Sequence, residues 1–354
     1  MTICAHMRSV FKDIERFFHK KFTPISRVPH IDRLLYQHKM TQRRMDMTGT
    51  AYMTKKIFFA LGTVCTLTLY DGHIPDALQR SRDRIMEIHD RMNAYDENSE
   101  VSRINAAAGM GFVKVSEDTF KLVVHSLAYS QMTNGLYDIT TRPLSALWKV
   151  AVNSKVLPLP YEIAKAKKAC GYRDIIIDRK HSAVMLRRKG MQIDLGAIAK
   201  GYAADEVRRI LEEEGVTEAI INFGGTVLNI GKHRRIGIQN PFEITGVTFA
   251  YADVGEKAVV TSGLYEQGFS KDGKTYHHIV DPKTGYPSES ELAGVTLIGD
   301  CAEQLDALST ATFMMGMRDA IPLLNELGIE AVFVAKNGDV FSTDGFTKSS
   351  SNAS

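Results

Sequence analysis

The order of helical and strand patterns constrains the fold of this chain more than any other feature of its sequence. Apolar residues recur at helical spacing over 75–93 and 197–214, and Ser116 is placed to cap another helix that ends before Gly135. After Gly215 the pattern changes to short strands, at 219–223, 235–239, 247–253, 276–280 and 292–298. Because helices and strands come in blocks instead of alternating, the sequence predicts an α+β fold with a mixed or antiparallel sheet and packed helices.

The C-terminal part continues this pattern. Two helices are expected, one over 302–315 and one ending at Gly328, before a hairpin whose turn is Asn337-Gly338. We therefore predict a single compact domain over 53–346, followed by a flexible tail at 347–354.

Residues 1–52 differ from the rest of the chain in composition. They hold ten Lys or Arg residues against four Asp or Glu, with two prolines and weak periodicity. We expect this segment to be a basic, poorly ordered extension. The remaining chain has 34 basic against 37 acidic residues, and such a slightly acidic body argues against nucleic-acid binding.

The stretch from Lys55 to Tyr70 imitates a lipoprotein signal, with a basic start and an apolar run around Cys65. The residue before Cys65 is Val64, which is not small, and Cys65, Leu67 and Leu69 alternate with threonines, so the pattern favours a strand. No run reaches the roughly 18 apolar residues that span a bilayer, so no stable membrane insertion is expected. Four widely spaced cysteines suit a cytoplasmic protein; a periplasmic lipoprotein is the alternative.

The segment IDLGAIAKGYAAD at 193–205 combines an acid, small residues and a lysine where a helix should begin. Small residues allow a close approach of the backbone to a ligand, and a helix N-terminus with a nearby lysine suits phosphate oxygens. The alternative is an ordinary helix capped by Asp194, with Lys200 solvated.

Asp306 and Thr310 are four residues apart in a predicted helix and therefore share a face. A carboxylate and a hydroxyl on one face form half of a hard-oxygen site suited to Mg²⁺. The alternative is that Asp306 caps the helix or forms an ion pair and that Thr310 is a packing residue.

Two adjacent histidines, His277 and His278, precede the turn DPKTGYP. In a strand they would point to opposite faces, so one is expected in the interior or a cleft, where a histidine can act as general base near neutral pH. A histidine that only hydrogen-bonds in a core is the alternative. Tyr95, Tyr137 and Asp138 lie in polar loops and are candidates to line a ring-binding pocket, or packing residues.

Six segments taken together narrow these alternatives. They are ALGTV, MNAYDENSEVSRIN, GLYDITTRPL, IDLGAIAKGYAAD with INFGG, SG followed by HHIVDPKTGYP, and DALSTA. In this order, over 58–346, they resemble the ApbE family of FAD:protein FMN transferases. The resemblance implies an ApbE-type, T-fold-like domain that uses Mg²⁺ and takes FAD as its substrate. Such a domain would move FMN from FAD onto a Ser or Thr hydroxyl in a motif of an acceptor protein, releasing AMP. The Mg²⁺ ligands would be the Ala197 carbonyl, Asp306 and Thr310.

The resemblance also implies residues that contact FAD. Asp194 and Lys200 would bind it, and His278 would act as general base or orient a phosphate, so that His278, Asp306 and Lys200 carry the catalysis. The pocket would be completed by Leu61, Tyr95, Leu136, Tyr137, Asp138 and Ile279.

Two other functions fit the same residues. With water as acceptor the protein would be a pyrophosphatase that yields FMN and AMP, and without chemistry it would be a flavin-binding protein. The tail adds one hypothesis, because Asp344, Thr347 and Ser350 have the spacing of the acceptor motif, which would allow self-modification at Ser350.

Overall fold

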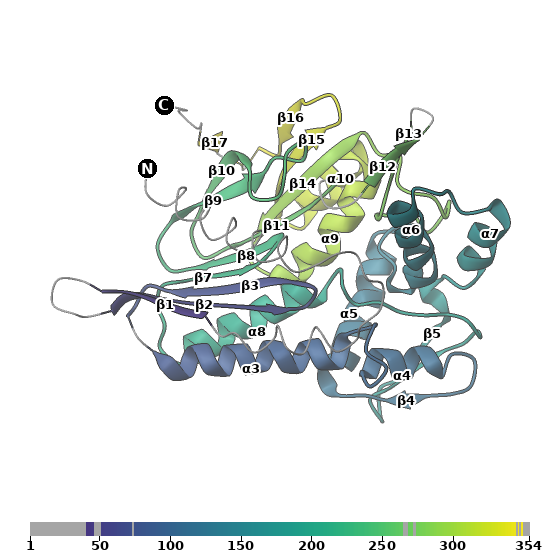
Figure 1. Cartoon of the computed structure of the whole chain (residues 1–354), viewed down its shortest axis with the longest axis horizontal. Coiled ribbons are helices and arrows are strands. Elements are labelled where there is room, and N and C mark those ends of the chain that lie inside the picture. The colour runs from purple at the N-terminus through teal and green to yellow at the C-terminus, as the bar shows by residue number, and fades with distance from the viewer. Residues whose placement is uncertain are drawn as a thin grey trace. The chain divides into compact units, whose positions relative to one another are not determined.

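A nine-stranded sheet forms the scaffold of the protein in a computed structural model (Figure 1). Its order is β1-β2-β3-β7-β8-β11-β14-β15-β16, and each neighbouring pair is antiparallel. These strands are β1 (Met40–Met45), β2 (Ala51–Ala60), β3 (Thr63–Leu69), β7 (Ala219–Phe223), β8 (Thr226–Ile230), β11 (Ala258–Gly263), β14 (Leu292–Gly299), β15 (Glu330–Ala335) and β16 (Val340–Ser342). With helices packed on this sheet, the predicted α+β class is confirmed.

The structure describes residues 40–45, 51–72, 74–264, 268–271, 274–344, 346 and 348–349. The chain divides into two units, Met1–Lys39 and Met40–Ser354, and all of the described residues belong to the second. The predicted start of the domain, residue 53, falls inside β2. The preceding strand β1 pairs with β2, so residues 40–45 also belong to the sheet. Most of the predicted extension, and Thr347 and Ser350 of the tail, lie outside the described residues.

Three smaller antiparallel sheets accompany the large one. Their orders are β17-β10-β9, β12-β13 and β4-β6-β5. Their strands are β4 (Val113–Lys114), β5 (Ile175–Asp178), β6 (Ala183–Leu186), β9 (Arg234–Gln239), β10 (Thr248–Val254), β12 (Gly268–Lys271), β13 (Lys274–His277) and β17 (Lys348–Ser349).

The turn between β2 and β3 is tight and unusual in its residues. Leu61 and Gly62 form the two-residue loop with φ of 52° and 74°, the positive values that match the twist of a hairpin. A leucine rarely adopts such a φ, so the surrounding strands hold Leu61 in a strained conformation. In β3, Cys65, Leu67 and Leu69 are buried, which confirms the predicted strand.

The helices are α3 (Pro75–Met92), α4 (Glu100–Ala106), α5 (Glu117–Met132), α6 (Arg142–Ser154), α7 (Pro160–Lys168), α8 (Ala199–Glu213), α9 (Ala302–Met315) and α10 (Met317–Glu326), with short 3-10 turns at Ile139–Thr141 and Tyr172–Asp174. The predicted caps and spacings are largely confirmed: Ser116 accepts a hydrogen bond from the Thr119 N–H at the start of α5. The alternative of a helix capped by Asp194 is wrong, because α8 begins at Ala199 with Ile198 as its N-cap and no side-chain hydrogen bond there.

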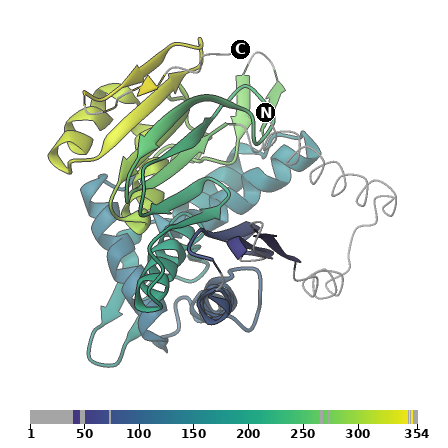
Figure 2. The same ribbon diagram turned by 90° about the vertical axis from the view of Figure 1, so that its left-hand side faces the viewer.

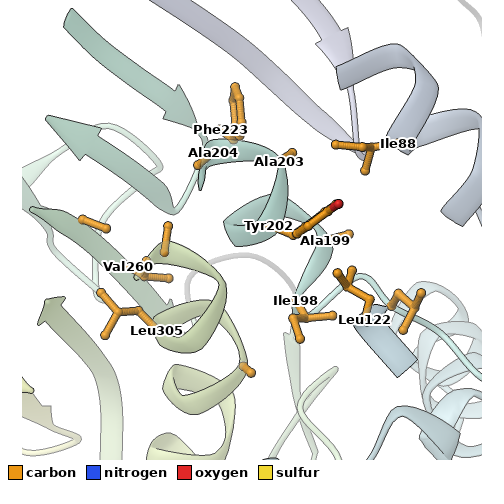
Figure 3. Close-up of a cluster of buried hydrophobic side chains, with 14 of the residues drawn as sticks. Ile88, Leu122, Ile198, Ala199, Tyr202, Ala203, Ala204, Phe223, Val260 and Leu305 are labelled. Atoms are coloured by element: carbon orange, nitrogen blue, oxygen red, sulfur yellow. The ribbon is translucent and has the colours of Figure 1, made fainter. Parts of the chain in front are cut away.

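Helix α8 lies at the centre of the hydrophobic core. It packs against α3, against β7 and β8 of the sheet and against α9, and both views of the ribbon place α3 and α8 on the same side of the sheet (Figures 1 and 2). Its small residues, Ala199, Ala203 and Ala204, let neighbouring elements approach closely, while Tyr202 and the preceding residue Ile198 are larger side chains buried in the same core (Figure 3). Among the described residues, no helix is both long and apolar enough to cross a membrane.

Candidate functional site

Helices α8 and α9 meet at their N-terminal turns, and a glycine makes this contact possible. A Cβ built on Gly201 would lie 2.2 Å from the carbonyl oxygen of Ala302 and 2.7 Å from the Cα of Glu303, so a larger residue does not fit. Each helix also carries an aspartate that caps the other. Asp306 Oδ2 accepts the Gly201 N–H at 2.9 Å, and Asp205 accepts the N–H groups of Ala302 and Glu303 at 3.2 and 2.9 Å. We call these five residues the α8–α9 junction.

Lys200 connects this junction to the loop before α8. Its ammonium donates to the Gly196 carbonyl at 2.7 Å and lies 3.3 Å from Asp306 Oδ1, so these two oxygens are within about 6 Å of each other. Asp306 is buried, and a buried carboxylate needs such partners on both oxygens. Ala197, the expected carbonyl ligand, is the next residue of the loop, and half-buried Thr310 follows Asp306 by one turn of α9.

Arg142, at the start of α6, contacts two of the predicted site residues. Its guanidinium lies 4.4 Å from the centroid of the Tyr95 ring, and Nη1 is 3.3 Å from Asp194 Oδ2. Nη2 donates to the Ala94 carbonyl at 2.7 Å. The other oxygen of Asp194 accepts the Gly196 N–H at 2.8 Å. Contacts therefore run without a break from the exposed Tyr95 ring, through Arg142 and the 194–196 loop, to Lys200 and Asp306.

Tyr137 and Asp138 are buried, and their side chains hydrogen-bond to neighbouring parts of the protein. Asp138 accepts hydrogen bonds from the Thr140 N–H at 2.8 Å and the Tyr172 N–H at 2.9 Å. Burial raises the pKa of the Asp138 carboxyl, against these donors, which lower it. Burial also raises the pKa of the Tyr137 phenol far above its usual value, so this hydroxyl stays protonated beside the Ser126 hydroxyl, 3.2 Å away. Leu136, the third member of this group, is half-buried.

Of the two adjacent histidines, His277 is the interior one. Its Nε2 donates to the Ser288 carbonyl at 3.0 Å, so its Nδ1 accepts the Ile279 N–H at 3.3 Å. Burial lowers the pKa of His277 to about 4, so it stays neutral near pH 7. His278 is half-buried and follows the end of β13. The predicted strand over 276–280 is wrong in its bounds, because β13 covers Lys274–His277 and the chain then bends.

Leu61 reaches this region from the β2–β3 turn. Its N–H lies 3.2 Å from Nδ1 of His89, in the last turn of α3. The segment after α3 carries Tyr95, whose N–H donates to Asn93 Oδ1 at 3.0 Å. The structure thus places Leu61 at the end of the same helix that leads into the Tyr95 loop.

The donor atoms available for a metal are hard oxygens. Within the part of the chain that the structure describes, no three His, Cys, Asp or Glu side chains gather as a metal site. The expected set has one carboxylate, from Asp306, with the Ala197 carbonyl and the Thr310 hydroxyl. Such a set suits Mg²⁺, which keeps water and substrate oxygens in its shell, better than it suits zinc or copper.

Two residues of this arrangement escaped the sequence analysis. Asp205 stands four residues after Gly201, as Asp306 stands four after Ala302, and this repeated spacing was the available signal. Arg142 lies in the GLYDITTRPL segment, but its role could not be read from the sequence, because its partners Tyr95 and Asp194 are about 50 residues away on either side of it.

The chain is similar to known proteins in both sequence and fold. A sequence model of the ApbE family matches residues 61–333. The chain is 34% identical over 281 residues to an FAD:protein FMN transferase of Klebsiella pneumoniae, covering 79% of this chain and 88% of the relative. A Treponema pallidum protein of the same name is 28% identical over 297 residues, covering 77% and 82%. The crystal structure of the ApbE protein from Thermotoga maritima superposes with a TM-score of 0.74 at 32% identity, covering 87% and 97%.

Proposed function

The chain belongs to the ApbE family, and from this we propose that it is an FAD:protein FMN transferase. Its curated relatives carry that name at 28–34% identity over most of their length, so the chain is an enzyme of the transferase class. In detail, FMN would pass from FAD to a Ser or Thr hydroxyl in a motif of an acceptor protein, forming a phosphoester and releasing AMP.

The observation that carries this proposal is the meeting of Lys200 and Asp306. These residues lie over a hundred positions apart, yet their charged groups are 3.3 Å apart at the N-terminus of α8. A helix N-terminus and a lysine attract phosphate oxygens, while a carboxylate beside them attracts a divalent cation. A site for a metal-bound pyrophosphate needs both kinds of group.

The residues present fit Mg²⁺. Asp306 is the buried carboxylate, the Ala197 carbonyl lies in the loop that Lys200 joins to it, and the Thr310 hydroxyl follows on the same face of α9. When bound, Mg²⁺ would neutralise phosphate charge as a Lewis acid. Gly201 keeps Asp306 in place through its N–H.

Transfer of a phosphoryl-type group needs alignment and charge neutralisation more than covalent catalysis. Lys200 would bind the pyrophosphate oxygens and stabilise the charge that develops on the leaving AMP. His278 is the candidate to accept the proton of the attacking hydroxyl. The burial and hydrogen bonds of the neighbouring His277 favour this choice, because both nitrogens of His277 are engaged within the core.

The pocket residues would bind the flavin nucleotide. Asp194, with Arg142, lies between Lys200 and the exposed Tyr95 ring, and an exposed ring can stack on a flavin or an adenine. The buried Tyr137 and Asp138 would shape the wall of the pocket. Leu61, Leu136 and Ile279 would supply its apolar lining.

One assay separates this function from its alternatives. The protein is incubated with FAD, Mg²⁺ and a candidate acceptor, and the acceptor is examined for covalent flavin fluorescence after denaturing electrophoresis. A fluorescent acceptor band with one AMP released per flavin supports transfer. Free FMN with no labelled acceptor supports a pyrophosphatase, and intact bound FAD supports a flavin-binding protein; either result would refute the proposal.

We also propose a cytoplasmic location. The described cysteines, Cys65, Cys170 and Cys301, are free thiols, as expected in a reducing compartment. Fractionation of cells that express the full-length chain tests this; recovery in the periplasm would contradict it.

A further inference from the structure

We propose that Arg142 is a positioning residue for FAD, a role that rests on the proposed function. It holds the Asp194 carboxylate and the Tyr95 loop in one fixed arrangement. Arg142 lies in the GLYDITTRPL segment, but the sequence assigned it no role, and the proposal comes from its contacts.

The guanidinium has three partners in two separate segments. It donates to the Ala94 carbonyl at 2.7 Å and to Asp194 Oδ2 at 3.3 Å, and it lies 4.4 Å from the Tyr95 ring centroid. Only the planar guanidinium of arginine can donate hydrogen bonds to a carbonyl and a carboxylate while it stacks on a ring face. The Arg142 side chain is 14% exposed, whereas Tyr95 is 67% exposed, so the cation lies beneath a ring that faces outward.

Arg142 also connects this ring to the phosphate side of the site. Asp194 Oδ1 accepts the Gly196 N–H at 2.8 Å, and the Gly196 carbonyl accepts from Lys200 at 2.7 Å. Without Arg142, Asp194 would lose its cation, and the loop of Ala94 and Tyr95 would lose its hydrogen bond to α6 and the closer of its two cation–ring contacts. FAD would then have to order both segments as it binds, at a cost in affinity.

Lys149 provides a matched control on the same helix. It lies seven residues after Arg142, on the same face of α6, and its ammonium is 4.9 Å from the same Tyr95 ring. It is exposed. Lys149→Met therefore removes one positive charge near the ring while the contacts of Arg142 with Ala94 and Asp194 stay in place.

The test measures FAD binding by fluorescence quenching and, separately, kcat and KM for FAD. We expect Arg142→Met to raise the Kd and KM for FAD by about tenfold or more, as the loss of charge-assisted hydrogen bonds does, with kcat at saturating FAD within about twofold. Lys149→Met should change Kd by less than about threefold, because an exposed cation–ring contact is weak. Arg142→Lys keeps the charge but cannot reach all three partners, so its Kd should stay raised.

A double-mutant cycle with Asp194→Asn shows whether Arg142 acts through Asp194. We expect the double variant to bind FAD little worse than either single variant, because both changes break one arrangement. Fully additive effects, or an Arg142→Lys variant that binds FAD like the wild type, would overturn the proposal, and Arg142→Lys serves this purpose even if Arg142→Met does not fold. Failure of the wild-type protein to bind FAD would instead refute the proposed function.

Discussion

Replacement of Gly201 by alanine tests the close contact between α8 and α9. The added Cβ would lie 2.2 Å from the oxygen and 2.6 Å from the carbon of the Ala302 carbonyl, and 2.7 Å from the Cα of Glu303. These neighbours are backbone atoms, so they cannot rotate away as a side chain can. The two helices must move apart, and the Gly201 N–H then loses Asp306 Oδ2.

The cost follows from three contributions. Overpacking costs about 1–3 kcal/mol, loss of a hydrogen bond to a charged group about 1.5–3 kcal/mol, and the better helix propensity of alanine returns about 1 kcal/mol. We therefore expect Gly201→Ala to lower the free energy of unfolding by about 1.5–5 kcal/mol, a large part of the stability of a typical domain. Activity should fall as well, since the same movement separates Asp306 from Lys200.

Urea unfolding followed by circular dichroism gives the stability, and release of AMP from FAD gives the activity. Gly111→Ala is the matched control, because a Cβ at Gly111 meets no atom within 4 Å and its φ is not positive. A Gly201→Ala protein with wild-type stability and activity would show that the helices do not meet as described.

Three further predictions concern charge. Asp306→Asn can keep the hydrogen bond from Gly201 but not the negative charge, so we expect a folded protein that has lost Mg²⁺-dependent AMP release; a wild-type rate, measured by chromatography, would contradict the metal assignment. Burial acts to raise the pKa of Asp118, but hydrogen bonds from Arg84 and Tyr202 outweigh it and lower this pKa to about 2. The stability that the lowered pKa contributes is therefore present above about pH 4 and is lost as the pH falls from about 4 to 2. Asp118→Asn should reduce the drop in the urea midpoint between pH 5 and pH 3, and an unchanged drop would refute the link. Burial lowers the pKa of His277 to about 4, so between pH 6.5 and 4 the unfolded chain binds a proton that the folded chain does not. The free energy of unfolding should therefore decrease as the pH is lowered from 6.5 to 4. His277→Gln should reduce the difference between the unfolding midpoints at pH 7 and pH 5, and an equal difference in both proteins would count against this prediction.

Local patterns in the sequence predicted much of the fold. The order of the helical and strand segments gave the α+β class. The cap at Ser116 and the turn at Asn337-Gly338 lie close to the elements that they delimit, and those elements, α5 and the β15–β16 hairpin, were found where they were expected. The predicted helix start near residue 197 was two residues early, because Ile198 and not Asp194 precedes the first turn.

Other features could not be predicted because they depend on contacts between distant segments. The pairing of β1 with β2 places Met40–Met45 in the sheet, although their composition resembled a disordered extension. Backbone hydrogen bonds between strands require no periodic side-chain pattern, so a strand of this kind leaves little trace in the sequence.

The sequence by itself determined which residues are available for the site: a lysine after a small-residue turn, an aspartate and a threonine on one helix face, and a tyrosine in a polar loop. Only the tertiary structure decided that Lys200 and Asp306 are 3.3 Å apart and that Arg142 connects Asp194 to Tyr95. Capping, turn and helix preferences act over a few residues and can be read along the chain. The distance between two charges on separate helices is decided by how the core packs, here by the absence of a side chain at Gly201.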